Sequence, residues 1–223
     1  MTSRFLSPLR RHKILIVDDH PIVRRGLAQV INEQQDLEVC GEAADVTEAL
    51  RQAEANHPEV VIIDLALGAE DGIELIDYIK SRWPLVKMLV SSARDERSFA
   101  GRALRAGALG YISKGEAVSQ IVAALHQVLR GEVYLSAQMA TCLLQRAAVG
   151  QTLDRDPVET LSDRELQVFE MIGEGLTTKQ IAHKLQVSPK TVESHRRLIK
   201  MKMSLPSSAQ LSRRAFQWVQ EHH

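Results

Sequence analysis

The sequence predicts an α/β domain built on a parallel sheet, followed by a smaller all-helical domain. Three observations lead to this prediction: apolar runs alternate with helical patterns over residues 13–129, strand-like runs stop after residue 131, and the charge changes sign near residue 157. Alternating strands and helices form parallel sheets with right-handed crossovers. The expected fold is therefore a doubly wound (βα)5 sheet of order 2-1-3-4-5, joined to a four-helix domain.

The predicted strands are short runs rich in Val, Ile and Leu. Strands covered on both faces have this composition, because neither face alternates with polar residues. They are Lys13–Val17, Leu37–Ala43, Val60–Asp64, Lys87–Ser91 and Gly110–Ser113. Between them, apolar residues recur at spacings of three and four, which predicts amphipathic helices. These are Ile22–Asn32, Val46–Asn56, Gly72–Ser81, Arg97–Ala106 and Val118–Leu129.

The pattern loosens after Gly131. One more helix is predicted over Ala137–Ala148, and the next twelve residues mix Gly, Thr, Asp and Pro without periodicity, as linkers do. The expected organisation is a first domain over 12–131, a linker over 132–160 that includes this helix, and a second domain over 161–221.

Four helices are predicted in the second domain: Asp163–Gly173, Thr178–Leu185, Pro189–Met203 and Ser208–Gln220. Ser162 and Glu165 have the spacing of a capping box, in which each side chain satisfies a backbone donor at the start of the first helix. Ser188 is a good N-cap, and Pro189 suits the first helical position. The tight connection before Pro189 indicates a helix-turn-helix.

The composition excludes several classes of protein. At 44% hydrophobic and 25% charged residues, it is that of ordinary soluble domains. No apolar run approaches the roughly 18–20 residues of a membrane helix, and the first residues lack the apolar segment of a signal peptide, so we expect a cytoplasmic protein without a membrane partner. Cys40 and Cys142 are far apart in contexts without other ligands, which argues against a disulfide framework or a zinc site.

The net charge of zero hides a difference between the two halves. Up to Pro157 there are 18 Lys and Arg against 21 Asp and Glu, a net of −3, whereas from Val158 onward there are 10 against 7, a net of +3. A small basic domain beside an acidic one is a common arrangement for nucleic-acid binding.

Three aspartates follow predicted strands. Asp18 and Asp19 come at the end of the first strand and Asp64 at the end of the third. In a sheet of the expected order these strands are neighbours, and ligands bind outside their carboxyl ends. The carboxylates should therefore converge, and a Mg²⁺ ion shared with phosphate oxygens would relieve their repulsion. The alternative is scattered, solvated aspartates.

Other residues of the same edge extend the pattern. Ser92 follows the fourth strand, and Lys114 follows the fifth, three residues after Tyr111. With these positions, the segments ILIVDDHPIVRRGL, VVIIDLALGAEDG and ALRAGALGYISKG resemble the receiver domain of two-component response regulators. Taken singly, Ser92 could be an ordinary strand-end serine, Tyr111 a core aromatic and Lys114 a surface cation.

The resemblance implies that Asp64 is the phosphoacceptor, attacking a phosphohistidine of a sensor histidine kinase. It also implies a Mg²⁺ ion held directly by Asp19, Asp64 and the backbone carbonyl of Ala66, with Asp18 acting through a bound water. Lys114 would pair with the phosphoryl group.

By the same resemblance, Ser92 would hydrogen-bond the phosphoryl oxygens, and its shift would let Tyr111 turn inward. Two positions depart from the common pattern: Gly68 stands four residues after Asp64 and Gly115 follows Lys114, both where receivers often have Pro. Both glycines add backbone freedom beside the site.

The predicted helix-turn-helix carries an excess of positive charge. Seven cations fall within 24 residues, opposed only by Glu193, and are expected on the outer side of the helices: Lys179, Lys184, Lys190, Arg196, Arg197, Lys200 and Lys202. The alternative is a basic face that only keeps the protein soluble, but solubility requires fewer positive charges than these seven.

The segment LSDRELQVFEMIGEGLTTKQIAHKLQVSPKTVESHRRLIKMKM closely resembles the LuxR-type DNA-binding domain, which indicates a regulator of the NarL/FixJ group. The resemblance implies that Pro189–Met203 enters the major groove. Base edges would be contacted by Glu193, Ser194 and Arg197, and phosphates by Lys190, Thr191 and Arg196. Thr177, Thr178 and Lys179 would hold the DNA backbone from the preceding helix, and Lys200 is a further DNA-binding residue. His195 is expected to be packed and hydrogen-bonded, and the alternative is a contact with DNA.

These features predict a phosphorylation-controlled, DNA-binding transcriptional regulator, not an enzyme. Its expected partners are a sensor histidine kinase, double-stranded DNA and, when phosphorylated, a second copy of itself, with RNA polymerase as a further partner. Two alternatives remain: a phosphohydrolase that turns over an aspartyl-phosphate at Asp64, and a receiver that acts mainly through protein contacts. No other catalytic motif supports an enzyme.

Overall fold

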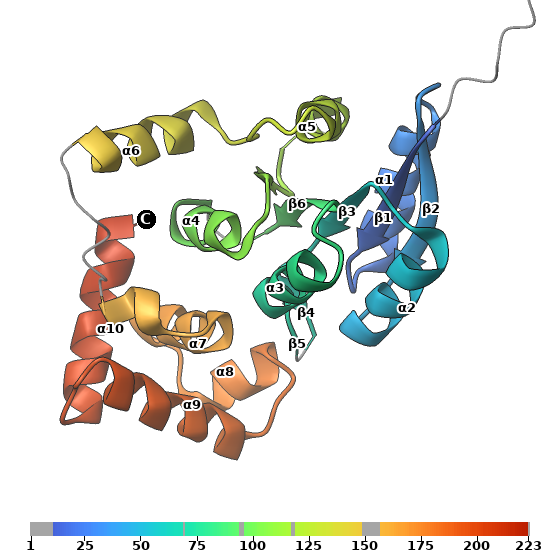
Figure 1. Cartoon of the computed structure of the whole chain (residues 1–223). Coiled ribbons are helices and arrows are strands. Elements are labelled where there is room, and N and C mark those ends of the chain that lie inside the picture. Colours follow the sequence, from blue (N-terminus) through green and yellow to red (C-terminus); the bar gives the residue numbers. More distant parts are fainter. Residues whose placement is uncertain (1–10, 69, 94–95, 117–118, 149–156, 223) are drawn as a thin grey trace, which may run out of the picture. The chain divides into compact units, whose positions relative to one another are not determined.

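The structure is a computed structural model that describes residues 11–68, 70–93, 96–116, 119–148 and 157–222 (Figure 1). The chain divides into two compact units, residues 1–140 and residues 141–223. Residues 149–156, which belong to the predicted linker, lie outside the described residues. The predicted limits of the two domains stay predictions. Among the described residues, no helix combines the length and the apolar character needed to cross a membrane.

Unit 1 contains a five-stranded sheet of order β2-β1-β3-β6-β7, and every pair of neighbouring strands is parallel. Its strands are β1 (His12–Val17), β2 (Leu37–Ala43), β3 (Val60–Ile63), β6 (Lys87–Ser92) and β7 (Gly110–Ser113). Numbered within this sheet alone, the order is the predicted 2-1-3-4-5. The doubly wound fold is therefore confirmed, with Asp64 just beyond the end of β3.

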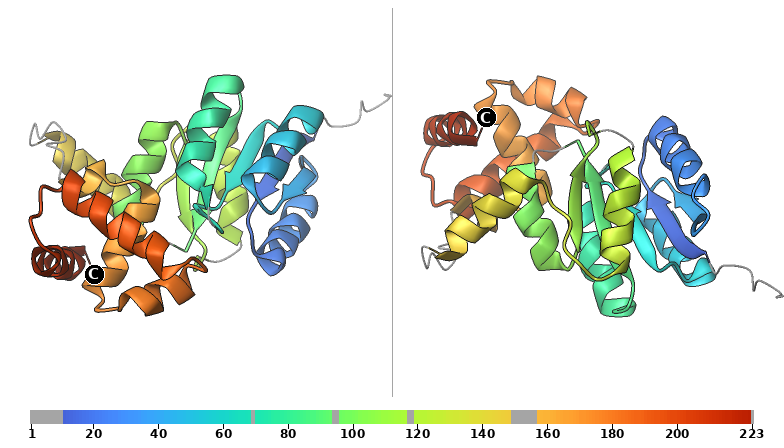
Figure 2. Two further views of the ribbon diagram at one scale, coloured as in Figure 1. Left: turned by 90° about the horizontal axis from the view of Figure 1, so that it is seen from below. Right: turned by 90° about the horizontal axis from the view of Figure 1, so that it is seen from above.

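Helices cover both faces of this sheet (Figure 2). They are α1 (Pro21–Asn32), α2 (Val46–Asn56), α3 (Gly72–Arg82), α4 (Glu96–Ala106) and α5 (Ser119–Leu129). Helix α1 contacts α5, whereas α3 contacts both α2 and α4. Because each strand faces helices on two sides, consecutive residues of β1 such as Ile14, Leu15 and Ile16 are all fully buried. This burial explains the unbroken apolar runs in the sequence.

Two features of unit 1 have no counterpart in the predicted elements. The short antiparallel pair β4 (Ala66–Leu67) and β5 (Glu70–Asp71) follows Asp64 directly. After α5, Tyr134 bridges to Gly110 of β7, and its carbonyl accepts a hydrogen bond from Tyr111 N at 2.9 Å. The first residues of the predicted linker are thus attached to the sheet edge. Helix α6 follows at Ala137–Ala148.

The described residues of unit 2 form helices and the turns that connect them. A short 3-10 helix, η1 (Pro157–Thr160), falls within the predicted linker and precedes α7 (Asp163–Gly173), α8 (Thr178–Lys184), α9 (Pro189–Lys202) and α10 (Ser208–His222). The Ser162–Glu165 capping box is present at the start of α7, and Ser188 caps α9 as predicted. Helix α8 has a second capping box, formed by Thr177 and Gln180.

The core of unit 2 lies where α7 packs against α9 and α10, and α8 packs against α9. Phe169 of α7 and Trp218 of α10 meet edge to face, with their ring centroids 6.1 Å apart. Aromatic pairs favour this geometry because the positive ring edge faces the negative ring face. The packing fixes α8 and α9 as a helix-turn-helix whose outer surface is open.

Candidate functional site

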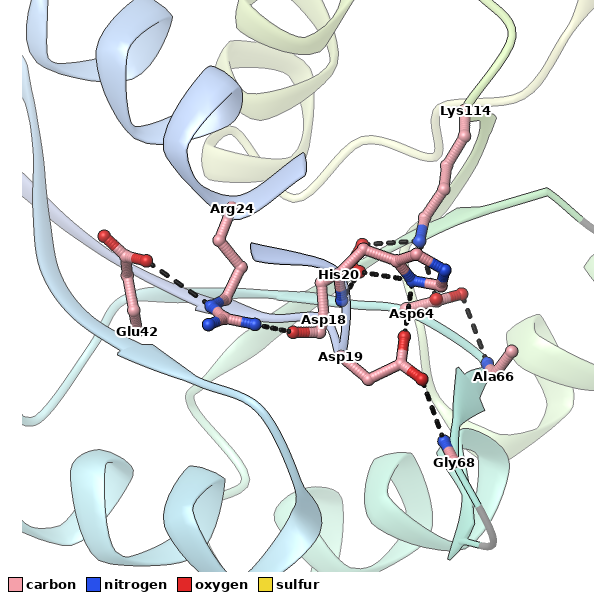
Figure 3. A network of polar contacts seen from close by, with 9 residues as sticks. All are labelled: Asp18, Asp19, His20, Arg24, Glu42, Asp64, Ala66, Gly68 and Lys114. Atoms are coloured by element: carbon pink, nitrogen blue, oxygen red, sulfur yellow. Dashed lines mark hydrogen bonds and ion pairs between the residues drawn. The ribbon is translucent and has the colours of Figure 1, made fainter. Parts of the chain in front are cut away.

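The sheet brings the predicted carboxylates together at its carboxyl edge (Figure 3). Asp18 and Asp19 follow β1, and Asp64 follows the adjacent β3. Oxygens of all three, with His20 Nδ1, lie within 4.8 Å of one another. Asp18 and Asp64 are each only 2% exposed. The sequence-based expectation that these carboxylates converge is met by the strand order.

Lys114 reaches this cluster from the end of β7, across the intervening β6 (Figure 3). Its Nζ lies 2.6 Å from Asp64 Oδ2 and 2.5 Å from Asp18 Oδ2. Burial raises the pKa of Asp64, while the Lys114 ammonium opposes this effect and Asp18 adds to it. Burial lowers the pKa of Lys114, but Asp64 and Asp18 outweigh it, so the net shift is upward. Lys114 is thus a cation shared by two buried carboxylates.

Backbone amides orient the remaining carboxylate oxygens. Asp64 Oδ1 accepts a hydrogen bond from Ala66 N at 3.2 Å, and Asp19 Oδ2 accepts one from Gly68 N at 3.2 Å. Gly68 has φ of +60°, a conformation that Pro cannot adopt because its ring fixes φ near −65°. The departure from Pro noted in the sequence therefore has a local structural reason.

The donor set suits a divalent cation of the Mg²⁺ class. Asp19 Oδ1 is buried and, among the described residues, accepts no hydrogen bond, although His20 Nδ1 lies 2.5 Å away. A hard cation with oxygen ligands would satisfy this oxygen and relieve the repulsion between the carboxylates. The residues present therefore fit Mg²⁺.

Ser92 is the last residue of β6, beside this edge, whereas Tyr111 is the second residue of β7 and pairs with Val90. Both are fully buried, so the Tyr111 ring already lies inward in this structure. Lys114 N donates to Ser92 O at 2.8 Å, which ties the lysine-bearing strand end to β6. The proposed movement of Ser92 and Tyr111 stays a prediction.

Sequence reasoning missed three residues that build the site (Figure 3). Arg24 Nη1 donates to the backbone oxygen of Asp18 at 2.6 Å, and Arg24 Nε lies 3.5 Å from Glu42 Oε2. His20 N donates to Asp18 Oδ1 at 2.8 Å. Arg24 and His20 stand close to Asp18 in the sequence, which was the one available signal. Glu42, on β2, gave none because its proximity depends on the sheet.

The second site is the outer surface of α8 and α9 in unit 2. Most of the predicted DNA-contacting residues are exposed there: Thr177, Lys179, Lys190, Thr191, Glu193, Ser194 and Arg197. Thr178, Arg196 and Lys200 are only partly exposed. The pattern of exposure follows the helix period, since Val192 and Ile199 face the core.

Lys202 is exposed, as expected for a cation of the outer side, but it also forms an ion pair within unit 2. Its Nζ lies 2.6 Å from Oε2 of Glu165, a carboxylate of α7 that is almost fully buried. Arg196, in contrast, is turned partly inward, with 15% of its side chain exposed. Burial of the Glu165 carboxylate requires a partner, and Lys202 provides it from the last turn of α9.

His195 is half-buried, as expected for a packed residue, but its expected hydrogen bond is not made by Nδ1. That atom is buried and has no hydrogen-bond partner among the described residues. Burial lowers the pKa of His195, and the nearby Arg164 lowers it further, against an opposing effect of Glu165. His195 is therefore neutral near pH 7 and adds no charge to the basic face.

Comparison with known protein families divides the chain into two matched regions, one in each unit. Residues 14–126 match the response regulator receiver domain family, and residues 159–215 match the luxR family of bacterial regulatory proteins. The oxygen regulatory protein NreC of Staphylococcus carnosus is 37% identical over 204 residues, which cover 89% of this chain and 94% of NreC. NreC of Staphylococcus epidermidis is 36% identical over a similar span.

Solved structures of response regulators also resemble this chain. RcsB of Salmonella typhimurium matches with a TM-score of 0.62 and 26% identity, covering 93% of this chain and 98% of that chain. A LuxR-family two-component response regulator from Aurantimonas matches with a TM-score of 0.58 and 32% identity, covering 62% of this chain and 99% of that one. The chain therefore belongs to the two-component response regulators with a LuxR-type DNA-binding domain, which are phosphorylation-controlled transcription regulators.

Proposed function

We propose that Asp64 accepts a phosphoryl group from a sensor histidine kinase and that α9 then binds DNA in the major groove. One observation carries the first part: Lys114 Nζ lies 2.6 Å from Asp64 Oδ2 within a cluster of three carboxylates. A buried nucleophile beside a fixed cation provides both positioning and charge neutralisation, which phosphoryl transfer needs most.

In the proposed transfer, one Asp64 oxygen forms the new bond to phosphorus while the bond from phosphorus to the donor histidine nitrogen breaks. The donor imidazole keeps the electron pair of that bond and takes up a proton from water. Lys114 exchanges its contact with Asp64 for one with a phosphoryl oxygen. We propose no turnover on an external substrate beyond this transfer and the later hydrolysis of the aspartyl-phosphate.

We propose that Asp18, Asp19, Asp64 and the backbone carbonyl of Ala66 hold Mg²⁺, with Asp18 acting through water. When bound, the ion supplies positive charge that neutralises the phosphoryl oxygens. Asp19 Oδ1, which is buried and accepts no hydrogen bond among the described residues, supports this assignment.

Phosphorylation should promote a symmetric dimer. We propose that the two copies pair through the face formed by β6, β7, α4 and α5, because Ser92 and Tyr111 lie on two of these elements. A few kcal/mol is enough to shift such an equilibrium. A palindromic pair of DNA half-sites also requires two-fold protein symmetry. Among relatives, RcsB is described as two dimers bound to two parallel DNAs.

Sedimentation of phosphorylated and unphosphorylated protein at equal concentration measures this dimerisation. We expect a higher average mass after phosphorylation in the micromolar range. Identical mass distributions across that range would contradict the proposal, and Asp64→Asn treated in the same way is the control.

For DNA, we propose that α9 presents Glu193, Ser194 and Arg197 to base edges. Phosphate contacts are assigned to Lys190, Thr191, Arg196 and Lys200, and to the start of α8 at Thr177, Thr178 and Lys179. The exposure of the base-facing residues supports this orientation. RNA polymerase is a further proposed partner of the DNA-bound form.

Arg197→Ala and Lys190→Ala should affect DNA binding in different ways. If Arg197 contacts a base edge, its loss costs about 1–3 kcal/mol on the preferred site and flattens discrimination at one base position. Lys190→Ala should weaken binding to all sequences alike and reduce the salt slope of log K by about one.

Titrations on preferred and scrambled duplexes at several salt concentrations separate the two effects. Equal losses on both duplexes for Arg197→Ala would mean that α9 docks differently and that Arg197 does not read a base. Absence of salt-dependent DNA binding by the parent chain would instead favour a receiver that acts through protein contacts.

A further inference from the structure

We infer that Thr178 positions the Glu193 carboxylate to read a base, so that the recognition helix selects a base pair presenting an amino donor, above all cytosine. The inference rests on the proposed function, because it requires α9 to lie in the major groove. It changes the role of Thr178 from a phosphate contact to a positioning residue for specificity.

The contact joins the two helices of the helix-turn-helix. Thr178 Oγ1, at the first residue of α8, donates a hydrogen bond to Glu193 Oε1 in α9 at 2.7 Å. A threonine hydroxyl has one hydrogen, so while it donates to Glu193 it cannot also donate to a DNA phosphate. The hydroxyl is therefore committed to the orientation of Glu193.

A second contact falls on the same oxygen. Arg196 Nε lies 3.7 Å from Glu193 Oε1, and the Arg196 side chain is only 15% exposed. The Glu193 side chain remains 60% exposed, and its other oxygen, Oε2, has no hydrogen bond to any described residue. One oxygen of the carboxylate is thus held by the protein, and the other is available as an acceptor.

The chemistry of a held carboxylate limits which base it can contact. Ionised Glu only accepts hydrogen bonds, and in the major groove the donors are N4 of cytosine and N6 of adenine. Adenine also presents the acceptor N7 next to its donor. In the major groove, guanine presents the acceptors N7 and O6, and thymine presents the acceptor O4. Electrostatic repulsion from these acceptors leaves cytosine as the best partner. Arg196 offsets part of the repulsion between Glu193 and the nearby phosphates.

The test uses the full chain and a pool of random duplexes. Selection with the parent protein defines a preferred site, and we expect one position of strong cytosine preference that depends on Glu193. Glu193→Gln should move that preference toward adenine, because an amide can both accept from N6 and donate to N7. Preference for cytosine over adenine at that position should fall by about tenfold or more.

Thr178→Val, which matches the shape of Thr but removes the hydroxyl, should lower the cytosine preference by about threefold or more. The loss of affinity should be larger on duplexes that carry the preferred cytosine than on scrambled duplexes. Thr178→Ser keeps the hydroxyl and should restore the preference. Circular dichroism and thermal unfolding of each variant establish that unit 2 is folded.

The outcomes separate this inference from the proposed function. If the parent selects a defined site but either Glu193→Gln or Thr178→Val leaves its base preferences unaltered, the inference is overturned and the proposed function stands. Equal loss by Thr178→Val on every duplex would assign Thr178 to a phosphate and also overturn it. If the parent selects no site at all, the proposed function fails and this inference fails with it.

Discussion

Asp64→Asn should abolish phosphorylation of the full chain by acetyl phosphate and Mg²⁺, whereas the parent should gain a single phosphoryl group. Asp64 is the buried carboxylate whose Oδ2 lies 2.6 Å from Lys114 Nζ, so it has both the nucleophilic oxygen and the neighbouring cation. Asn preserves the shape of the side chain but cannot form the acyl phosphate. Intact-mass analysis before and after incubation measures the result.

Asp77→Asn is a matched control for this change. Asp77 is exposed on α3 of the same unit and lies outside the carboxylate cluster, so its replacement should leave the labelling unchanged. If Asp64→Asn gains a phosphoryl group as readily as the parent, Asp64 is not the acceptor. Circular dichroism of both variants shows whether unit 1 is folded.

Gly173→Ala should destabilise unit 2 by about 1–3 kcal/mol, against the usual preference of helices for Ala over Gly. A Cβ at Gly173 would lie 2.5 Å from the backbone oxygen of Ala215 and 2.6 Å from Val219 Cγ2, where α7 crosses α10. Backbone atoms cannot move aside without separating the two helices, so packing should outweigh propensity. For a unit of this size the expected fall in Tm is about 5–15 °C.

Thermal unfolding followed by calorimetry measures this effect, and DNA binding should be lost at the temperature where unit 2 melts. Gly101→Ala is the matched control: it makes the same change in α4, where the new Cβ would meet only Arg105 Nη1 at 3.7 Å. We expect unchanged or higher stability for Gly101→Ala. An unchanged Tm for Gly173→Ala would show that α7 and α10 are not packed as described, and phosphorylation at Asp64 should persist in both variants.

Much of the fold could be predicted from the sequence because its signals are local. The central strand β3 and the second half of β1 are apolar at every position, and the caps at Ser162 and Ser188 involve residues no more than three apart. The convergence of Asp18 and Asp64 was also predictable, because parallel strands place their carboxyl ends at one edge. These features follow from the order of residues along the chain, because they depend on residues that are close in the sequence or on the order of the strands.

Other features depended on contacts between residues far apart in the chain. Lys202 has the exposed pattern of a DNA-binding cation, yet it pairs with Glu165, 37 residues away. Glu42 approaches Arg24 only because β2 lies beside β1, and Thr178 meets Glu193 across the turn between α8 and α9.

The sequence by itself therefore determined the elements of this protein, their order and the residue types at the edge of the sheet. Only the tertiary structure decided which cations form ion pairs within the protein and which carboxylate oxygens are left to accept hydrogen bonds from a ligand. The physical reason is range: helix and strand patterns arise from neighbouring residues, whereas an ion pair or a hydrogen bond between elements requires two side chains to meet within about 3 Å. That condition depends on packing and rotamers, which no local pattern specifies.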